Sequence, residues 1–229
     1  MNKELLTDIV EWDVKNWSKA INYWQENVDF SRKDIVGLEL GGNKGGLSLW
    51  LAKNECNVIC SDLNSPEEKA KVLHEKYKVT EQIRYKAIDA TNIGFKNEFD
   101  IVVFKSILGG IAGNGKNELM QQTINEIYKS LKPSGVLLFA ENLESSKLHQ
   151  VIRKHFVSWG ARWNYLKYKD IDTLFSQFEE VNHRTVGFFG TFGRTEKQRN
   201  FLSSFDAVFD QLIPKKKKYI VYGIAKKKK

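Results

Sequence analysis

Near its start the chain carries apolar residues at helical spacing. Intervals of three and four positions, typical of one helix face, separate Trp17, Ile21, Trp24 and Val28. Ile9 and Val14 extend the stripe toward the N-terminus. The pattern predicts one or two amphipathic helices over residues 4–28.

Short continuous apolar runs follow, and helical patterns separate them. Runs of strand length lie at 34–41, 57–62, 83–89, 99–106 and 135–142, with helical patterns at 45–54, 65–78 and 116–131. The last third predicts helices at 145–156, 170–178 and 196–212, with strands at 179–189 and 219–225. Apolar strands that alternate with helices are typical of a parallel sheet covered on both faces. The chain therefore predicts an α/β fold.

The composition fits a single folded domain with a small addition. Of the 229 residues, 41% are hydrophobic and 12% aromatic, which excludes a disordered chain and allows a full core. We expect residues 1–33 to form an N-terminal helical extension and residues 34–229 to form the main domain.

The net charge of +8 is concentrated near the C-terminus. Lys215–Lys218 and Lys226–Lys229 contain eight lysines, and removing them from the 36 basic residues leaves 28, equal to the 28 acidic residues. A neutral body is a poor match to a basic groove for nucleic acid.

Two cysteines and the first residues bear on the compartment. Cys56 and Cys60 are four positions apart, or about 13 Å on a strand, which is too far for a disulfide. The N-terminal residues include acids where a signal peptide needs an apolar stretch, and no run reaches the ~18 apolar residues of a membrane span. We expect a cytoplasmic protein.

The stretch LELGGNKGGLSLWLA, from Leu38 to Ala52, contains four glycines within six residues. A glycine-rich turn between a strand and a helix is a ready site for a nucleotide-like ligand. The dinucleotide pattern G-x-G-x-x-G is not met, because Asn43 stands where its second glycine belongs.

The turn instead resembles motif I of the class I S-adenosylmethionine-dependent methyltransferases, an acidic residue followed by G-x-G-x-G. Glu39, Gly41, Asn43 and Gly45 fall on that register, and Gly42 lies within it. Asn43 replaces the usual glycine, and asparagine tolerates a positive φ well. The resemblance covers residues 34–142 best, and it implies a Rossmann-like seven-stranded sheet and S-adenosyl-L-methionine as cofactor.

The resemblance also implies roles for residues at the ends of three further strands. Asp62 would bind the ribose hydroxyls, and Leu63 would cover one face of the adenine. The Asp89 carboxylate would accept from the exocyclic amine and the Ala90 N–H would donate to the ring, while Lys105 and Ser106 would approach the methionine end. The simpler alternatives are that Asp62 and Asp89 cap turns and that Glu39 forms a structural salt bridge.

Methyl transfer from a sulfonium is an in-line displacement, and an alcohol acceptor must also lose a proton. Glu141, directly after the fifth strand, and His149, in the next helix, are the candidate catalytic bases. Arg162 and Trp163 offer a cation and a ring for stacking on a sugar or a nucleobase. We expect no metal site, because no cluster of ligands stands at metal-binding spacing.

The acceptor is predicted from a finer resemblance. The segments LSLWLA, VICSDL, FKSILGGI and FFGTFGR are similar to methyltransferases associated with bacterial capsule and O-antigen polysaccharide synthesis. This resemblance implies O-methylation of a sugar or surface glycan. An RNA methyltransferase and a non-catalytic adaptor that binds the cofactor remain the alternatives.

The two lysine runs belong to different edges in this topology. Lys215, Lys216, Lys217 and Lys218 would lie near the acceptor, where they would attract an anionic acceptor or contact a membrane peripherally. Lys226–Lys229 would emerge about 23 Å away, at ~3.3 Å per residue along the last strand.

Overall fold

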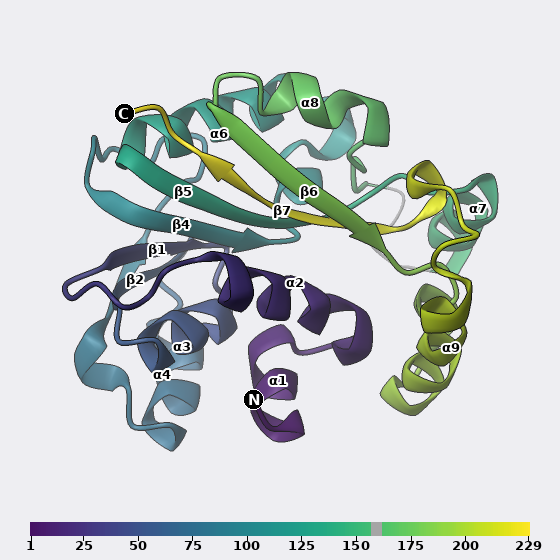
Figure 1. Ribbon diagram of the computed structural model, residues 1–229, viewed down its shortest axis with the longest axis horizontal. Coiled ribbons are helices and arrows are strands. Elements are labelled where there is room, and N and C mark those ends of the chain that lie inside the picture. The colour runs from purple at the N-terminus through teal and green to yellow at the C-terminus, as the bar shows by residue number, and fades with distance from the viewer. Residues whose placement is uncertain (157–161) are drawn as a thin grey trace.

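The computed structural model describes residues 1–156 and 162–229. Within them one sheet contains β1 (Val36–Leu40), β2 (Asn57–Asp62), β3 (Ile83–Ala87), β4 (Phe99–Lys105), β5 (Leu131–Asn142), β6 (Glu180–Val186) and β7 (Ile220–Lys226). The strand order is β3-β2-β1-β4-β5-β7-β6 (Figure 1). β1 to β5 run parallel, and β7 pairs antiparallel with both β5 and β6. The predicted Rossmann-like, seven-stranded fold of the class I methyltransferases is confirmed.

Helices cover both faces of the sheet (Figure 1). One face carries α1 (Lys3–Val10), α2 (Val14–Asn27), α3 (Gly46–Lys53) and α4 (Glu67–Lys76). The other carries α5 (Leu108–Ile111), α6 (Glu118–Ser130) and α8 (Ile171–Leu174). At the end of the sheet where β7 begins lie α7 (Lys147–Phe156) and α9 (Glu196–Phe209).

Single turns of 3-10 helix occupy several connections. They are η1 (Thr80–Gln82), η2 (Gly113–Gly115), η3 (Tyr168–Asp170), η4 (Gly190–Phe192) and η5 (Lys215–Lys217). No helix in residues 1–156 or 162–229 is both long and apolar enough to cross a membrane.

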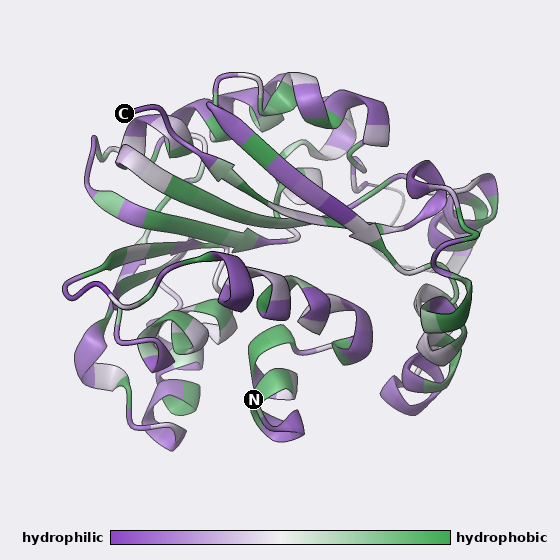
Figure 2. Cartoon of the chain, viewed as in Figure 1, coloured by the Kyte–Doolittle hydropathy of each residue, from purple (hydrophilic) through white to green (hydrophobic). Residues whose placement is uncertain are grey.

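The core has two apolar layers, one on each side of the sheet. Trp24 and Trp50 pack at 5.7 Å between ring centroids in the layer beneath α2 and α3, and Phe139 stacks on Phe175 at 4.3 Å in the other. The central strands β4 and β5 are largely hydrophobic, whereas the edge strand β6 is mostly hydrophilic (Figure 2). Central strands are buried on both faces, so their apolar runs are continuous.

The N-terminal residues form two helices joined by a sharp turn, which we call the elbow (Glu11, Trp12 and Asp13). Glu11 and Asp13 have φ of 67° and 47°, which no helix can accommodate. The Glu196 carboxylate accepts hydrogen bonds from the N–H groups of Asp13 and Val14, at 2.9 Å each. The elbow is therefore held by α9, a contact between the two ends of the chain.

Two segments differ from the sequence prediction. The fifth strand begins at Leu131 rather than at residue 135, because Leu131 already pairs with Phe99 before a register shift. The helix predicted from residue 116 begins at Glu118, and α5 precedes it. Gly109 and Gly110 within α5 hide its helical signal, because glycine has low helix propensity.

Gly46→Ala tests the contact between α1 and α3. A Cβ at Gly46 would overlap the carbonyl oxygen and carbon of Ile9, which are backbone atoms. We expect the free energy of unfolding in urea to fall by about 1–3 kcal/mol, as overpacking does. Lys53→Ala, at an exposed position of the same helix, is the control and should change stability little. Equal stability of Gly46→Ala and the parent would contradict this packing.

Candidate functional site

The glycine turn between β1 and α3 has the backbone that its residues predict. Gly41, Asn43 and Gly45 have φ of +67°, +44° and +73°, so the tolerance of Asn43 for positive φ is used. The Gly42 N–H donates to the Ser61 carbonyl at 2.7 Å, which ties the turn to β2.

Glu39 lies beneath this turn and is almost fully buried. Its carboxylate accepts from the N–H groups of Leu47 and Ser48, at 3.1 and 2.9 Å, and from the Ser48 hydroxyl. Burial raises the pKa of Glu39 to about 7, and these hydrogen bonds oppose the rise. Glu39 thus anchors the first turn of α3 through N–H and hydroxyl donors rather than a salt bridge.

His74 supports the turn from α4. Its Nε2 donates to the Gly45 carbonyl at 2.9 Å, while Nδ1 accepts from the Tyr85 hydroxyl at 2.8 Å. Burial lowers the pKa of His74, which favours the neutral ring that this arrangement needs. The sequence alone gives no sign of this contact, because Gly45 and Tyr85 are distant from His74 along the chain.

Asp62 and Leu63 follow directly beside the turn. The two oxygens of the half-buried Asp62 carboxylate accept from the N–H groups of Asn43 and Leu63, at 3.0 and 2.7 Å. Leu63 is 67% exposed, so its apolar side chain is available to a ligand.

Asp89 and Ala90 lie at the same edge of the sheet. β3 ends at Ala87, and the next residue, Ile88, donates its N–H to the Asp62 carbonyl at 2.8 Å. One oxygen of the exposed Asp89 carboxylate accepts from the N–H and hydroxyl of Thr91, at 2.8 and 2.7 Å. Asp89 therefore caps a turn and keeps a second oxygen for other partners.

A cavity of about 240 Å³ opens over the glycine turn. Its walls are Ile9, Glu11, Trp12, Glu39, Gly41, Gly42, Asn43, Gly46, Leu47, Lys105 and Ser106. The sequence predicted the turn and the two residues at the end of β4, Lys105 and Ser106, but it missed the contribution of the elbow. The acidic residues on either side of Trp12 interrupt the apolar stripe of the predicted helix. This interruption was the one sign in the sequence that the chain turns at the elbow.

Lys105 stands in the wall of this cavity at the end of β4. Its Nζ lies 5.1 Å from the ring centre of Trp17 and 5.7 Å from that of Trp12. Burial lowers the pKa of Lys105, and no carboxylate in the described parts of the chain lies within ion-pair distance. A desolvated cation without an anionic partner suits an anionic group of a ligand.

Ser106 follows Lys105 with a φ of +58°. Its N–H donates to the Ala140 carbonyl at 2.8 Å, and its hydroxyl accepts from the side-chain amide of Asn142. These contacts fix the backbone at the cavity wall.

Glu141 is fully buried directly beyond Lys105. Its carboxylate accepts from the N–H groups of Ile107, Leu108 and Asn142, at 2.9, 2.8 and 2.8 Å. Burial raises its pKa to about 7. The group holds the start of α5 in the same way that Glu39 holds α3.

His149 is also buried, among the rings of Phe188, Phe192 and Tyr219. Its Nε2 donates to the Phe188 carbonyl at 2.9 Å, and Nδ1 accepts from the Ser146 hydroxyl at 2.7 Å. Burial lowers its pKa to about 4. Both ring nitrogens therefore have protein partners.

Arg162 and Trp163 follow the residues that the structure does not describe. The Trp163 ring packs over Gly109 and Gly110 of α5, where a Cβ on Gly109 would overlap it. Arg162 is exposed, and its carbonyl accepts from the Asn114 N–H at 3.2 Å. Residues 157–161, directly before this pair, lie outside the described residues.

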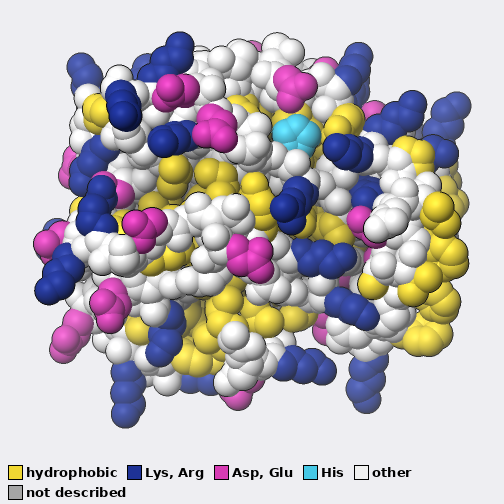
Figure 3. Space-filling view, in the orientation of Figure 1, with side chains coloured by type: hydrophobic (Ala, Val, Ile, Leu, Met, Phe, Trp, Pro, Cys, Tyr) yellow, Lys and Arg dark blue, Asp and Glu magenta, His cyan; other side chains and the backbone are white. Residues whose placement is uncertain are grey.

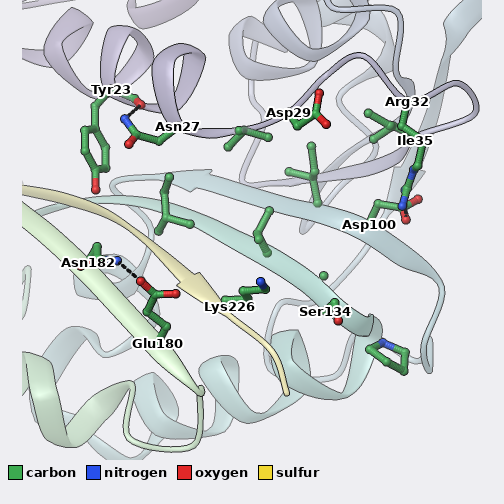
Figure 4. Close-up of a pocket in the computed structure, with 16 residues that line it drawn as sticks. Tyr23, Asn27, Asp29, Arg32, Ile35, Asp100, Ser134, Glu180, Asn182 and Lys226 are labelled. Carbon is green, nitrogen blue, oxygen red and sulfur yellow. Dashed lines mark hydrogen bonds and ion pairs between the residues drawn. The ribbon is translucent and has the colours of Figure 1, made fainter. Parts of the chain in front are cut away.

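A larger cavity of about 510 Å³ lies at the opposite edge, where β1, β4 and β5 begin (Figure 4). There the Arg32 side chain forms an ion pair with Asp100, and the Asn182 amide donates to Glu180 at 2.6 Å. Ligands of open α/β sheets bind at the carboxyl ends of the strands, so we assign the site to the smaller cavity. The described residues contain no group of three or more His, Cys, Asp or Glu that could hold a metal ion.

Comparison with known proteins finds one matching family model. Residues 38–139, which include the glycine turn and the ends of β2, β3 and β4, match the family model of a methyltransferase domain. A search of curated proteins finds no match.

Solved structures share the fold at low sequence identity. Phosphoethanolamine N-methyltransferase 2 of Haemonchus contortus, in complex with phosphomonomethylethanolamine and S-adenosylhomocysteine, aligns with a TM-score of 0.63 at 17% identity. That alignment covers 93% of this chain and 53% of that one, so the chain spans about half the length of this relative.

Two further structures with this fold are named for reactions other than N-methylation. The carbon methyltransferase CurJ has a TM-score of 0.56 at 16% identity, covering 91% of this chain and 52% of that one. The [4+2]-cyclase SpnF has a TM-score of 0.63 at 14% identity, covering 94% and 81%. The shared fold therefore leaves the acceptor open.

The fold, the glycine turn at the end of β1 and the matched segment lead to one conclusion. The chain has the fold of the class I methyltransferases, and its residues 38–139 match a methyltransferase domain.

Proposed function

We propose that this protein transfers the methyl group of S-adenosyl-L-methionine to a hydroxyl oxygen of a sugar or surface glycan in the cytoplasm. The observation that carries the methyl-transfer part is the cavity over the glycine turn, with an unpaired Lys105 in its wall. The ring of Trp12 in the same wall supports a sugar acceptor, because sugar faces stack on aromatic rings.

The cofactor would be held by groups from four strand ends. The backbone of Gly41, Gly42, Asn43 and Gly45 would approach it closely. Asp62 and Leu63 would bind its ribose and adenine, and Asp89 with the Ala90 N–H would bind the adenine edge. Lys105, with Ser106 beside it, would bind the carboxylate of the methionine part. The desolvated ammonium group of Lys105 has no anionic partner in the described parts of the protein, and this carboxylate would supply one.

The sulfonium of the bound cofactor supplies an electrophilic methyl group. The chain must align the acceptor oxygen with it, exclude water and remove a proton. Glu11 and Trp12 of the elbow line the cavity and would exclude water from part of it, while Arg162 and Trp163 remain proposed contacts for the acceptor. Glu141 and His149 remain the two predicted bases, although each already has hydrogen-bond partners within the protein.

A peripheral contact with an anionic surface is the last part of the proposal. Lys215, Lys216 and Lys217 are exposed and lie just before β7, at the edge that carries the glycine turn. Lys218 differs, because its Nζ is buried against Asp210 at 2.8 Å. The contact would therefore use three of the four lysines.

The acceptor class is tested by methyl transfer from labelled cofactor to a panel of glycans, nucleotide sugars and RNAs. Labelled sugar hydroxyls are the expected result. Label on RNA would support the alternative of an RNA methyltransferase. Cofactor binding without transfer to any member would support a non-catalytic adaptor.

Asp62→Ala tests the cofactor site. Loss of a charged hydrogen-bond acceptor should weaken S-adenosylhomocysteine binding by about 1.5–3 kcal/mol, measured by calorimetry. Asp172→Ala, an exposed carboxylate on α8, is the control and should leave the affinity unchanged. Equal affinities of Asp62→Ala and the parent would remove Asp62 from the site.

Lys105→Met tests the proposed carboxylate contact. Removing a desolvated cation should leave the melting temperature of the free protein unchanged or higher, yet weaken S-adenosylhomocysteine binding by roughly tenfold or more. 5′-Methylthioadenosine lacks the amino-acid part, so its affinity should not change. A similar loss for both ligands would mean that Lys105 acts through the shape of the cavity.

Glu141→Gln and His149→Gln separate catalysis from anchoring. A base predicts a fall in kcat of about 10²–10⁴ with unchanged cofactor affinity and stability. Anchoring predicts a loss of roughly 1–3 kcal/mol in unfolding free energy, because a buried hydrogen-bond set is broken, with kcat largely kept. Because every polar atom of both side chains is engaged, we expect the stability loss for both variants.

A further inference from the structure

Helix α9 differs from the other helices, because it buries polar residues and exposes apolar ones. Its buried residues are polar, namely Ser203 and Asp206, each 1% exposed. The Asp206 carboxylate accepts from the N–H groups of Phe188, Phe189 and Gly190, at 2.7, 2.7 and 3.0 Å. The helix is thus attached to the protein through polar contacts.

The opposite side of α9 is apolar and faces solvent. We call it the α9 stripe: Phe201, Phe205, Val208 and Phe209, with Leu212 just beyond the helix, exposed by 66, 40, 72, 39 and 77%. The spacing of four, three, one and three positions places them on one face. Figure 3 shows apolar side chains gathered at the right-hand edge, over α9.

An exposed apolar face of this kind costs free energy in water and marks a binding surface. The aromatic rings form a row. The ring centroids of Phe201 and Phe205 are 5.3 Å apart, and the ring centroid of Phe189 lies 6.3 Å from that of Phe205 and 6.2 Å from that of Phe209. The row is therefore an ordered surface rather than a set of scattered side chains.

The charges around the α9 stripe have one sign. All three acids of this segment are directed to partners in the protein: Glu196 to the elbow, Asp206 to η4 and Asp210 to Lys218. Exposed basic side chains lie at both ends, Arg194 and Lys197 before the stripe and Lys215, Lys216 and Lys217 after it.

This distribution decides between two occupants. Two copies of the stripe packed on each other would bring basic ends together whether the helices ran parallel or antiparallel, and like charges oppose such a pair. An anionic lipid surface satisfies both features, because its acyl region accepts the rings and its headgroups attract the lysines.

We propose that the α9 stripe docks this protein on an anionic lipid surface, with α9 lying in the plane of the interface. This proposal deepens the peripheral contact proposed above. It places that contact on a helix with an apolar face rather than on a lysine run alone. Because α9 and η5 lie at the edge where β7 begins, docking brings the carboxyl ends of the parallel strands toward the lipid (Figure 1).

The test is sedimentation of the full chain with vesicles, either of phosphatidylcholine alone or with added phosphatidylglycerol. We expect binding only to the anionic vesicles, and weaker binding as salt increases. The variant Phe201→Ser with Phe205→Ser and Val208→Ser should lower the partition coefficient by about tenfold or more. Replacing Lys215, Lys216 and Lys217 with Gln should lower it by about 10- to 100-fold at low salt.

Two control variants match these changes elsewhere on the surface. Val72→Ser removes an apolar side chain that is 69% exposed on α4. Replacing Lys226, Lys228 and Lys229 with Gln removes the same charge from exposed lysines at the opposite edge. Both controls should bind anionic vesicles as the parent does, and S-adenosylhomocysteine affinity should be equal in all variants.

Three results would overturn the proposal. They are equal binding to neutral vesicles, equal loss from the two lysine variants, and a dimer in solution that the serine variant dissociates. The last would assign the α9 stripe to a second copy of this chain. Cofactor titration and methyl transfer need no vesicles, so failure of lipid binding leaves the proposed activity standing.

Discussion

The carboxylate of Glu39 fixes the geometry on which the candidate site depends. It lies at the end of β1 and accepts the first free N–H groups of α3, so the strand and the helix cannot separate without exposing unpaired donors. The glycine turn is the short connection between these fixed elements. The end of β1 and the start of α3 are close together, so only a tight turn with positive φ angles can connect them, and the cavity lies over this turn.

Glu141 repeats this arrangement two strands further along the sheet, on the other side of β4. It lies near the end of β5 and accepts the N–H groups at the start of α5, next to Lys105. Two buried acids thus position two helix starts on either side of the end of β4. The cation between them lies against the rings of Trp12 and Trp17, which come from the elbow and α2. The N-terminal segment is therefore part of the cavity wall, although we predicted it as an extension of the domain.

The sequence predicted the parallel strands and the glycine turn, because these depend on local patterns, whereas the seven-stranded sheet was implied by the resemblance to class I methyltransferases. Apolar runs of strand length and residues that permit positive φ are visible without knowledge of distant contacts. The elbow was not predicted as part of the site, because its position depends on Glu196, which is more than 180 positions away. The roles of Glu141 and His149 were equally hidden, since a sequence shows the acid and the imidazole but not the N–H and carbonyl groups that bind them. The reversed polarity of α9 was readable only once its buried face was known.

The buried acids couple folding to proton uptake. Glu39, Glu141 and Asp13 of the elbow all have pKa values raised to about 7, mainly by burial. Their ordinary values are 4.5 for glutamate and 3.8 for aspartate, which the unfolded chain retains. Between those values and pH 7 each of these acids binds more protons in the folded chain than in the unfolded chain, so its contribution to stability falls as the pH rises through this interval. The buried His149 acts in the opposite sense, because its pKa is lowered to about 4 and its contribution to stability falls as the pH falls below the ordinary value of 6.5. The burial that aligns the helix starts therefore gives these acids a pH dependence opposite to that of carboxylates held in ion pairs.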